Sequence, residues 1–141
     1  DSGDFDFSFS GLKTAVLREV QKISAKGRSA SGGKKLNNKT IADLSASVQQ
    51  AIIDVLVKKT IKAAQEYKVK SILLSGGVAA NQKLREEFAL KIENLKLKIP
   101  LSVPPKNLCT DNGAMIASAA FFNYKEVSWQ KLTADPELYF D

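Results

Sequence analysis

The chain has 141 residues, which is enough for one domain with a sizeable core, and its composition of 44% hydrophobic and 26% charged residues is typical of a globular protein. It contains no histidine, which argues against a self-contained Ser-His-Asp hydrolase or a zinc protease. The single cysteine, Cys109, cannot form an internal disulfide, so we expect the cytoplasm or an organelle matrix. No apolar run approaches a membrane span in length, and the net charge of +6 suits a polyanionic partner.

The first segment, residues 4–11, alternates polar and aromatic side chains. This alternation predicts a strand that buries Phe5, Phe7 and Phe9 on one face. A strand needs neighbours, and we therefore expect the chain to be a fragment of a larger protein. A helix follows over residues 12–23, where apolar residues recur at helical spacing.

Residues 25–39 have the glycine, serine and lysine content of a mobile basic loop. Arg28, Lys34 and Lys35 in this loop either contact phosphates without reading sequence or are simply solvated. The longest helix is predicted over residues 40–67, capped by Asn38 or Thr40. Its apolar stripe marks it as scaffold and consists of Ile41, Leu44, Val48, Ile52, Val55, Leu56 and Ala63.

A buried strand over residues 70–74 runs into the glycine pair Gly76 and Gly77, and a helix is predicted over residues 80–95. Adjacent glycines allow a sharp turn and the close approach of a flat ligand. Free N–H groups at a helix start favour anionic or polar ligand atoms. The amide of Asn81 can read a polar edge. The alternative is a strand-to-helix turn that binds nothing.

A weaker strand over residues 97–103 leads to a second turn and to a small-residue helix over residues 114–122. Asp111 in this turn is either a hard oxygen ligand for Mg²⁺, Mn²⁺ or Fe²⁺, or the N-cap of the helix. One carboxylate cannot hold a metal by itself. Because ligands gather beyond the carboxyl ends of strands, both turns are expected to face one cleft. Residues 123–141 are expected to form an irregular tail, packed down by Trp129, Leu132, Leu138 and Tyr139.

Three motifs now carry a resemblance: residues 7–13 (FSFSGLK), 75–81 (SGGVAAN) and 109–117 (CTDNGAMIA). In this order they resemble the C-terminal lobe of the tRNA N6-adenosine threonylcarbamoyltransferase family, which was long labelled O-sialoglycoprotein endopeptidase. The threonine before Asp111 looks more like the bacterial and organellar branch. The resemblance implies an α/β fold over residues 1–141 as a single domain. That domain would be part of an ASKHA (actin/Hsp70-like, RNase H-like) C-terminal lobe, helix-rich with a small truncated sheet.

The resemblance also implies transfer of threonylcarbamoyl from threonylcarbamoyl-adenylate to N6 of the adenosine beside the tRNA anticodon. Gly76 and Gly77 would form the floor under an adenylate or ATP-type nucleotide, and Asn81 would contact it. Asp111 would ligate a divalent metal (Fe, Zn or Mg) together with two histidines of an H-x-x-x-H motif that this chain lacks. The fragment alone would be inactive.

The implied partners are tRNA, a paralogous ASKHA subunit, a small ATPase of the modification complex and the missing N-terminal lobe, with no membrane. Arg28, Lys34 and Lys35 are the candidate tRNA contacts. An unpaired sheet edge predicts that the fragment self-associates. Two other classes stay open: the C-terminal lobe of an ASKHA ATPase or sugar kinase, and a non-catalytic lobe that binds a partner protein.

Overall fold

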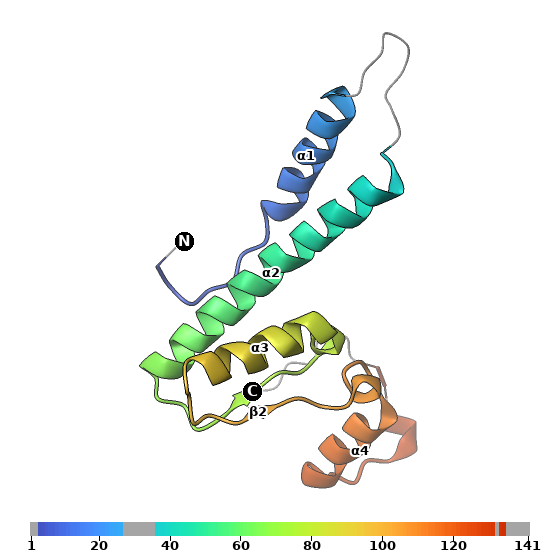
Figure 1. Ribbon diagram of the computed structural model, residues 1–141. Coiled ribbons are helices and arrows are strands. Elements are labelled where there is room, and N and C mark those ends of the chain that lie inside the picture. Colours follow the sequence, from blue (N-terminus) through green and yellow to red (C-terminus); the bar gives the residue numbers. More distant parts are fainter. Residues whose placement is uncertain (1–2, 27–35, 132, 135–141) are drawn as a thin grey trace.

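The computed structural model describes residues 3–26, 36–131 and 133–134. Its elements are α1 (Leu12–Lys26), α2 (Asn38–Glu66), β1 (Ile72–Leu73), the 3₁₀ helix η1 (Gly77–Ala80), α3 (Gln82–Asn94), β2 (Leu101–Ser102), the 3₁₀ helix η2 (Lys106–Leu108), α4 (Gly113–Phe122) and the 3₁₀ helix η3 (Trp129–Lys131). The long helix α2 is the backbone of the arrangement. In Figure 1, α1 runs beside its first half, α3 lies against its second half, and α4 stands away from it.

The core lies between the second half of α2 and α3. Its buried members are Ile53, Val57, Ile61 and Ala64 from α2, Ile72 from β1, and Leu84 and Phe88 from α3. The α2 residues recur every three or four positions, so they share one helix face. The predicted stripe meets this face only in part: Leu56 packs against the core, whereas Ile41 and Leu44 line a groove beside α1. The apolar pattern did not single out the face that packs against α3, because α2 has apolar side chains toward both neighbouring helices.

Among the described residues, α2 is long and apolar enough to cross a membrane by length and composition, with a mean hydropathy of 1.3 over its most apolar window. The expectation that no run approaches such a length is therefore wrong by this measure. The feature is weak evidence for a membrane, since the core helices of soluble proteins pass the same test.

The cap of α2 is Asn37, not Asn38 or Thr40 as predicted. Its side-chain oxygen accepts a hydrogen bond from the Thr40 backbone N–H at 2.7 Å. An N-cap has extended backbone geometry, which Asn37 adopts, with φ −76° and ψ 160°, while Asn38 already lies in the helix. The sequence offers two adjacent asparagines, and only the backbone geometry decides between them.

Both α2 and α3 end in the same way. Lys68 and Lys96 follow the two helix ends in the left-handed region, with φ of 49° and 50°. The next residue in each case donates its N–H back into the helix, from Val69 to Ala64 O at 3.1 Å and from Leu97 to Ile92 O at 3.0 Å. These bonds define Schellman motifs, which satisfy carbonyl groups left free at a helix end. Each motif then leads into a strand.

The two strands pair in parallel, with Ile72 opposite Leu101 and Leu73 opposite Ser102. Flanking bonds extend the pairing slightly, from Ile72 N to Pro100 O and from Leu74 N to Ser102 O, each 3.0 Å long. Ile72 is 6% exposed while Leu73 is 76% exposed. The prediction of a strand buried on both faces is therefore wrong for Leu73, because the described residues cover only one face of this pair.

The segment before α1 is not the predicted strand. Within the described part of the chain it pairs with neither β1 nor β2, and Phe7 and Phe9 are exposed. Phe5 does pack, with its ring centroid 5.7 Å from that of Tyr67 and 5.4 Å from Lys62 Nζ. Alternating aromatic residues satisfy the pattern of a strand, but a strand forms only where another strand accepts its backbone hydrogen bonds.

The predicted loop at 25–39 is shorter at both ends, since Ala25 and Lys26 belong to α1, and Asn38 and Lys39 to α2. Arg28, Lys34 and Lys35 lie outside the described residues. The tail prediction is wrong for Trp129, which begins η3 and is 76% exposed instead of packed down. The other tail anchors, Leu132, Leu138 and Tyr139, also fall outside the described residues.

Candidate functional site

The turn after β1 has the backbone geometry that a glycine permits. Gly76 has φ 78° and ψ 177°, and a Cβ built on it would enter open space. A side chain here would be strained, and it would fill the space next to the turn. The helix predicted over residues 80–95 is confirmed as α3, which starts at Gln82, and the short 3₁₀ helix η1, opened by Gly77, separates it from the glycine pair. The N-terminus of α3 therefore lies at Asn81 and not at the glycine pair.

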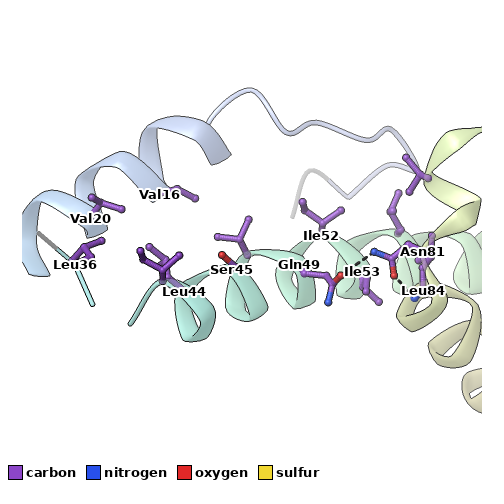
Figure 2. A pocket seen from close by; sticks show the side chains of 14 residues that line it. Val16, Val20, Leu36, Leu44, Ser45, Gln49, Ile52, Ile53, Asn81 and Leu84 are labelled. Carbon is purple, nitrogen blue, oxygen red and sulfur yellow. Dashed lines mark hydrogen bonds between the residues drawn. The ribbon is translucent and has the colours of Figure 1, made fainter. Parts of the chain in front are cut away.

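Asn81 joins α3 to α2. It is the N-cap of α3, where its side-chain oxygen accepts from the Leu84 N–H at 3.1 Å. Its amide nitrogen donates to the side-chain oxygen of Gln49 on α2 at 2.9 Å, as the dashed line in Figure 2 shows. Both ends of the amide thus have a partner inside the chain. Each end keeps capacity for one more hydrogen bond, because the nitrogen has a second hydrogen and the oxygen a second lone pair.

The turn after β2 frees Asp111 from the capping role considered above. The N-cap of α4 is Asn112, with φ −153° and ψ 153°, and its side-chain oxygen accepts from the Met115 N–H at 2.9 Å. The same side chain donates to Thr110 O at 2.8 Å. Asp111 is exposed, and no described residue forms a hydrogen bond or ion pair with its carboxylate. The interpretation of Asp111 as the cap is therefore wrong.

The two turns lie next to each other. A Cβ built on Gly77 would meet Thr110 Cγ2 at 3.8 Å, an ordinary van der Waals contact. The parallel pairing of β1 and β2 explains this contact, since both strands then end at the same edge. The two turns thus lie side by side at Gly77 and the residue before Asp111, while the expectation that both face one cleft stays a prediction. Asn81 lies at the far end of η1, against α2.

Arg85 connects the two turns, although its local sequence pattern does not single it out. Its Nε donates to Ala79 O at 2.5 Å, and its Nη2 donates to Pro104 O at 2.8 Å and to Cys109 Sγ at 3.1 Å. The side chain is partly buried. Arg85 lies four residues after Asn81, and residues at this spacing share one face of a helix. This spacing is the local signal that places Arg85 beside the strand-to-helix turn after β1. The link to Pro104 and Cys109 is visible only in three dimensions.

The described residues do not form a metal site by themselves. They contain no group of three or more His, Cys, Asp or Glu side chains that could hold an ion. The thiol of Cys109 is buried and accepts the Arg85 hydrogen bond, so it does not complete a site with Asp111. Asp111 is thus one candidate ligand, and a divalent ion there requires further ligands from outside the described residues.

An apolar groove of about 620 Å³ lies between α1, α2 and η1. Figure 2 shows Val16 and Val20 of α1 facing Leu44 of α2 across it, with Gln49 and Asn81 near one end. The groove is lined by Val16, Val20, Leu36, Ile41, Leu44, Ser45, Val48, Gln49, Ile52, Ile53, Leu56, Val78, Asn81 and Leu84. Neither Gly76, Gly77 nor Asp111 lines it, so the groove and the meeting point of the two turns are separate features that share Asn81 as a neighbour.

Comparison with known proteins places these turns in a family. The profile of tRNA N6-adenosine threonylcarbamoyltransferase matches residues 2–118, which include both turns. The chain belongs to this family. A relative of that name from Dehalococcoides mccartyi is 49% identical over 122 residues, 86% of this chain and 32% of the relative. A relative of the same name from Halalkalibacterium halodurans is 46% identical over 95% of this chain and 36% of the relative. Another, from Listeria welshimeri, is 42% identical over 98% of this chain and 38% of the relative. The chain thus spans about a third of the length of these curated relatives.

Proposed function

We propose that the whole protein of which this chain is a part transfers threonylcarbamoyl from threonylcarbamoyl-adenylate to N6 of the adenosine beside the tRNA anticodon. The family match over residues 2–118 supports this proposal. The observation that carries it for this chain is that the two turns lie side by side, with Gly77 next to Thr110, at the shared end of β1 and β2. In parallel sheets ligands bind beyond this end of the strands.

The role proposed for this chain is to bind and orient the nucleotide part of the substrate. Gly76 and Gly77 would form the floor beneath the adenylate, where the open space beside Gly76 admits a flat group. Asn81 would add a hydrogen bond with the capacity that its contacts to Gln49 and Leu84 leave over. Each of these residues would bind the substrate, and none of them would transfer a proton.

Asp111 is proposed as the contribution of this chain to a divalent metal site of Fe, Zn or Mg. Its support is an exposed carboxylate that does not cap α4, since Asn112 has that role. The remaining ligands, two histidines of an H-x-x-x-H motif in the N-terminal lobe, would come from a part of the protein outside this chain. A bound divalent ion supplies positive charge that attracts the oxygen atoms of a substrate.

We also propose that the chain is part of an ASKHA lobe in the cytoplasm or an organelle matrix. Its proposed partners there are tRNA, a paralogous ASKHA subunit and a small ATPase. The basic residues Arg28, Lys34 and Lys35 are the proposed tRNA contacts. For the isolated chain we propose association with a second copy. The basis is no longer the strand predicted at residues 4–11, but the exposed apolar side chains of α4 and the unpaired outer edges of β1 and β2.

The test of the proposed activity uses the full-length protein with its complex subunits, tRNA, threonine, bicarbonate and ATP. N6-threonylcarbamoyladenosine in the digested tRNA, measured by mass spectrometry, is the expected product. Unmodified tRNA together with ATP-dependent phosphorylation of a sugar would support the kinase alternative instead. For self-association, sedimentation of the isolated chain over a wide concentration range is the measurement, and a monomer at all concentrations would contradict it.

A further inference from the structure

Arg85 occupies a position where a cation gains nothing from its own helix. It is the fourth residue of α3 and lies at the end of the first helical turn, where the helix dipole still disfavours positive charge. Its side chain points back toward the start of the helix, as side chains in α-helices do. The reason for an arginine here must therefore come from what the side chain contacts outside α3.

These contacts join two segments that are distant in sequence. Through Nε the guanidinium bonds to Ala79 O in η1, the segment that follows the glycine pair. Through Nη2 it bonds to Pro104 O at 2.8 Å and Cys109 Sγ at 3.1 Å, both in the connection that leads to Asp111. Two of the three acceptors are uncharged backbone carbonyl groups, and no described carboxylate forms an ion pair with Arg85. Charge neutralisation does not explain the arrangement, whereas the fixed fork of the guanidinium does.

The segments joined by Arg85 are themselves well fixed at the points of contact. Ala79 is 0% exposed and Cys109 is 4% exposed. The ladder between β1 and β2 consists of only two residue pairs, Ile72 with Leu101 and Leu73 with Ser102. Beyond this short ladder, among the described residues, the Arg85 side chain adds hydrogen bonds between the two turns to the close approach of Gly77 and Thr110.

We propose that Arg85 is a positioning residue that sets the distance between the glycine floor at Gly76 and Gly77 and the carboxylate of Asp111. The proposal rests on the proposed function, because it assumes that these two turns serve one bound substrate. Arg85 does not contact the substrate. Its hydrogen bonds to Ala79, shortly after the glycines, and to Cys109, shortly before Asp111, fix the position of one turn relative to the other.

The test compares Arg85→Lys with Arg18→Lys in the full-length protein. Lysine keeps the charge but has a single ammonium group, which cannot reproduce the fork across both segments. Arg18 is exposed on α1 and provides a matched control for the same substitution. In Arg85→Lys we expect amide hydrogen exchange to become about ten-fold faster in η1 and in residues 104–112 together, with α2 unchanged. Arg18→Lys should resemble the wild type.

Three results would overturn the proposal: unchanged exchange in both segments, faster exchange in only one of them, or faster exchange throughout α2 as well. Where the protein transfers threonylcarbamoyl, kcat of Arg85→Lys should fall while KM for tRNA stays the same, and a change in KM alone would also count against the proposal.

A second variant covers the case in which Arg85→Lys fails to fold. Cys109→Ala removes one acceptor and should speed exchange in residues 104–112, and wild-type exchange there would contradict the proposal. Failure of the wild type to modify tRNA would refute the proposed function, while the exchange results would still decide the role of Arg85.

Discussion

The two strand-to-helix turns differ in how fully this chain supports them. The turn after β1 is built into the core, with Ala79 0% exposed, Leu84 1% exposed and Asn81 bonded to Gln49 on α2. The turn after β2 leads into α4, none of whose residues is buried. Within the described residues it is joined to the rest of the chain by β2 and by the hydrogen bond between Arg85 and Cys109, and Thr110 lies close to Gly77.

The first turn is thus packed into the described core, whereas the second leads into a helix that the described residues leave exposed. The helix α4 is apolar around its whole circumference, with Met115, Ile116, Phe121 and Phe122 between 48% and 79% exposed. A helix that is hydrophobic all round is normally buried inside a larger protein. We infer that α4 is covered in the whole protein. The experiments below contrast the two turns, from the largest expected effect to the smallest.

The largest effect should come from testing the chain by itself. We expect the isolated 141-residue chain to show no transfer of threonylcarbamoyl to tRNA. Its half-supported second turn offers one carboxylate, Asp111, and a single carboxylate cannot bind a divalent ion firmly. Mass spectrometry of tRNA incubated with the purified chain is the measurement. Modified tRNA, in a preparation free of the full-length enzyme, would show that both turns are functional without further parts.

The next contrast compares stability around the two turns in the isolated chain. Leu84→Ala below the first turn should lower the free energy of unfolding by about 2–5 kcal/mol, because it leaves a cavity between α3 and α2. Ile116→Ala in α4 should change it very little, since that side chain is 64% exposed. Urea denaturation of both variants measures this difference. Equal losses would mean that α4 packs against the chain in solution and that the comparison of the two turns does not hold.

A change at the second turn should act on activity more than on stability. In the full-length protein, Asp111→Asn is expected to reduce transfer by about 100-fold or more, judged from the smaller losses caused by changes around metal ligands. Its melting temperature should stay close to that of the wild type, because Asn112 caps α4. Asn112→Ala is the control, with a stability loss of about 1 kcal/mol from the lost cap. If Asp111→Asn kept the metal content and the turnover of the wild type, Asp111 would not be a metal ligand.

Changes at Asn81 in the first turn should affect both stability and ligand binding, because Asn81 has both a structural and a proposed ligand role. Asn81→Ala removes the cap of α3 and should cost about 1 kcal/mol of stability. Asn81→Asp keeps a capping oxygen but loses the donor to Gln49, so it should lose less stability than Asn81→Ala while still weakening AMP binding in the full-length protein. Calorimetric titration with AMP and thermal melts separate the two roles. Unchanged AMP affinity in both variants would leave Asn81 as a purely structural cap.

The smallest effect concerns the basic residues between α1 and α2. Neutralising Arg28, Lys34 and Lys35 in the full-length protein should lower the salt dependence of tRNA binding, by roughly 0.7–0.9 in log-log slope for each phosphate contact that is lost. Binding measured at several salt concentrations gives this slope. An unchanged slope would show that these residues are solvated and do not contact tRNA.

The sequence predicted much of this local structure, and the errors have a common cause. The four helices α1 to α4 and the strand-to-turn positions at Gly76 and Asp111 follow from periodicity and turn chemistry, which act over a few residues. The strand predicted around Phe7 failed because a strand depends on a neighbour that local alternation does not supply. The role of Arg85 was missed for the same reason, since its partners Pro104 and Cys109 are distant in sequence.

The matching Schellman motifs at Lys68 and Lys96 have a consequence for how the length of this chain can vary. Each one closes a helix that packs in the core and starts a short connection to one of two paired strand residues, Ile72 or Leu101. Inserting one residue into the first connection would exchange the faces of Ile72 and Leu73, because neighbouring side chains in a strand point in opposite directions. Both connections should therefore keep a constant length among relatives, a pattern that comparing their sequences can check. Insertions and deletions in this part of the protein would have to fall elsewhere.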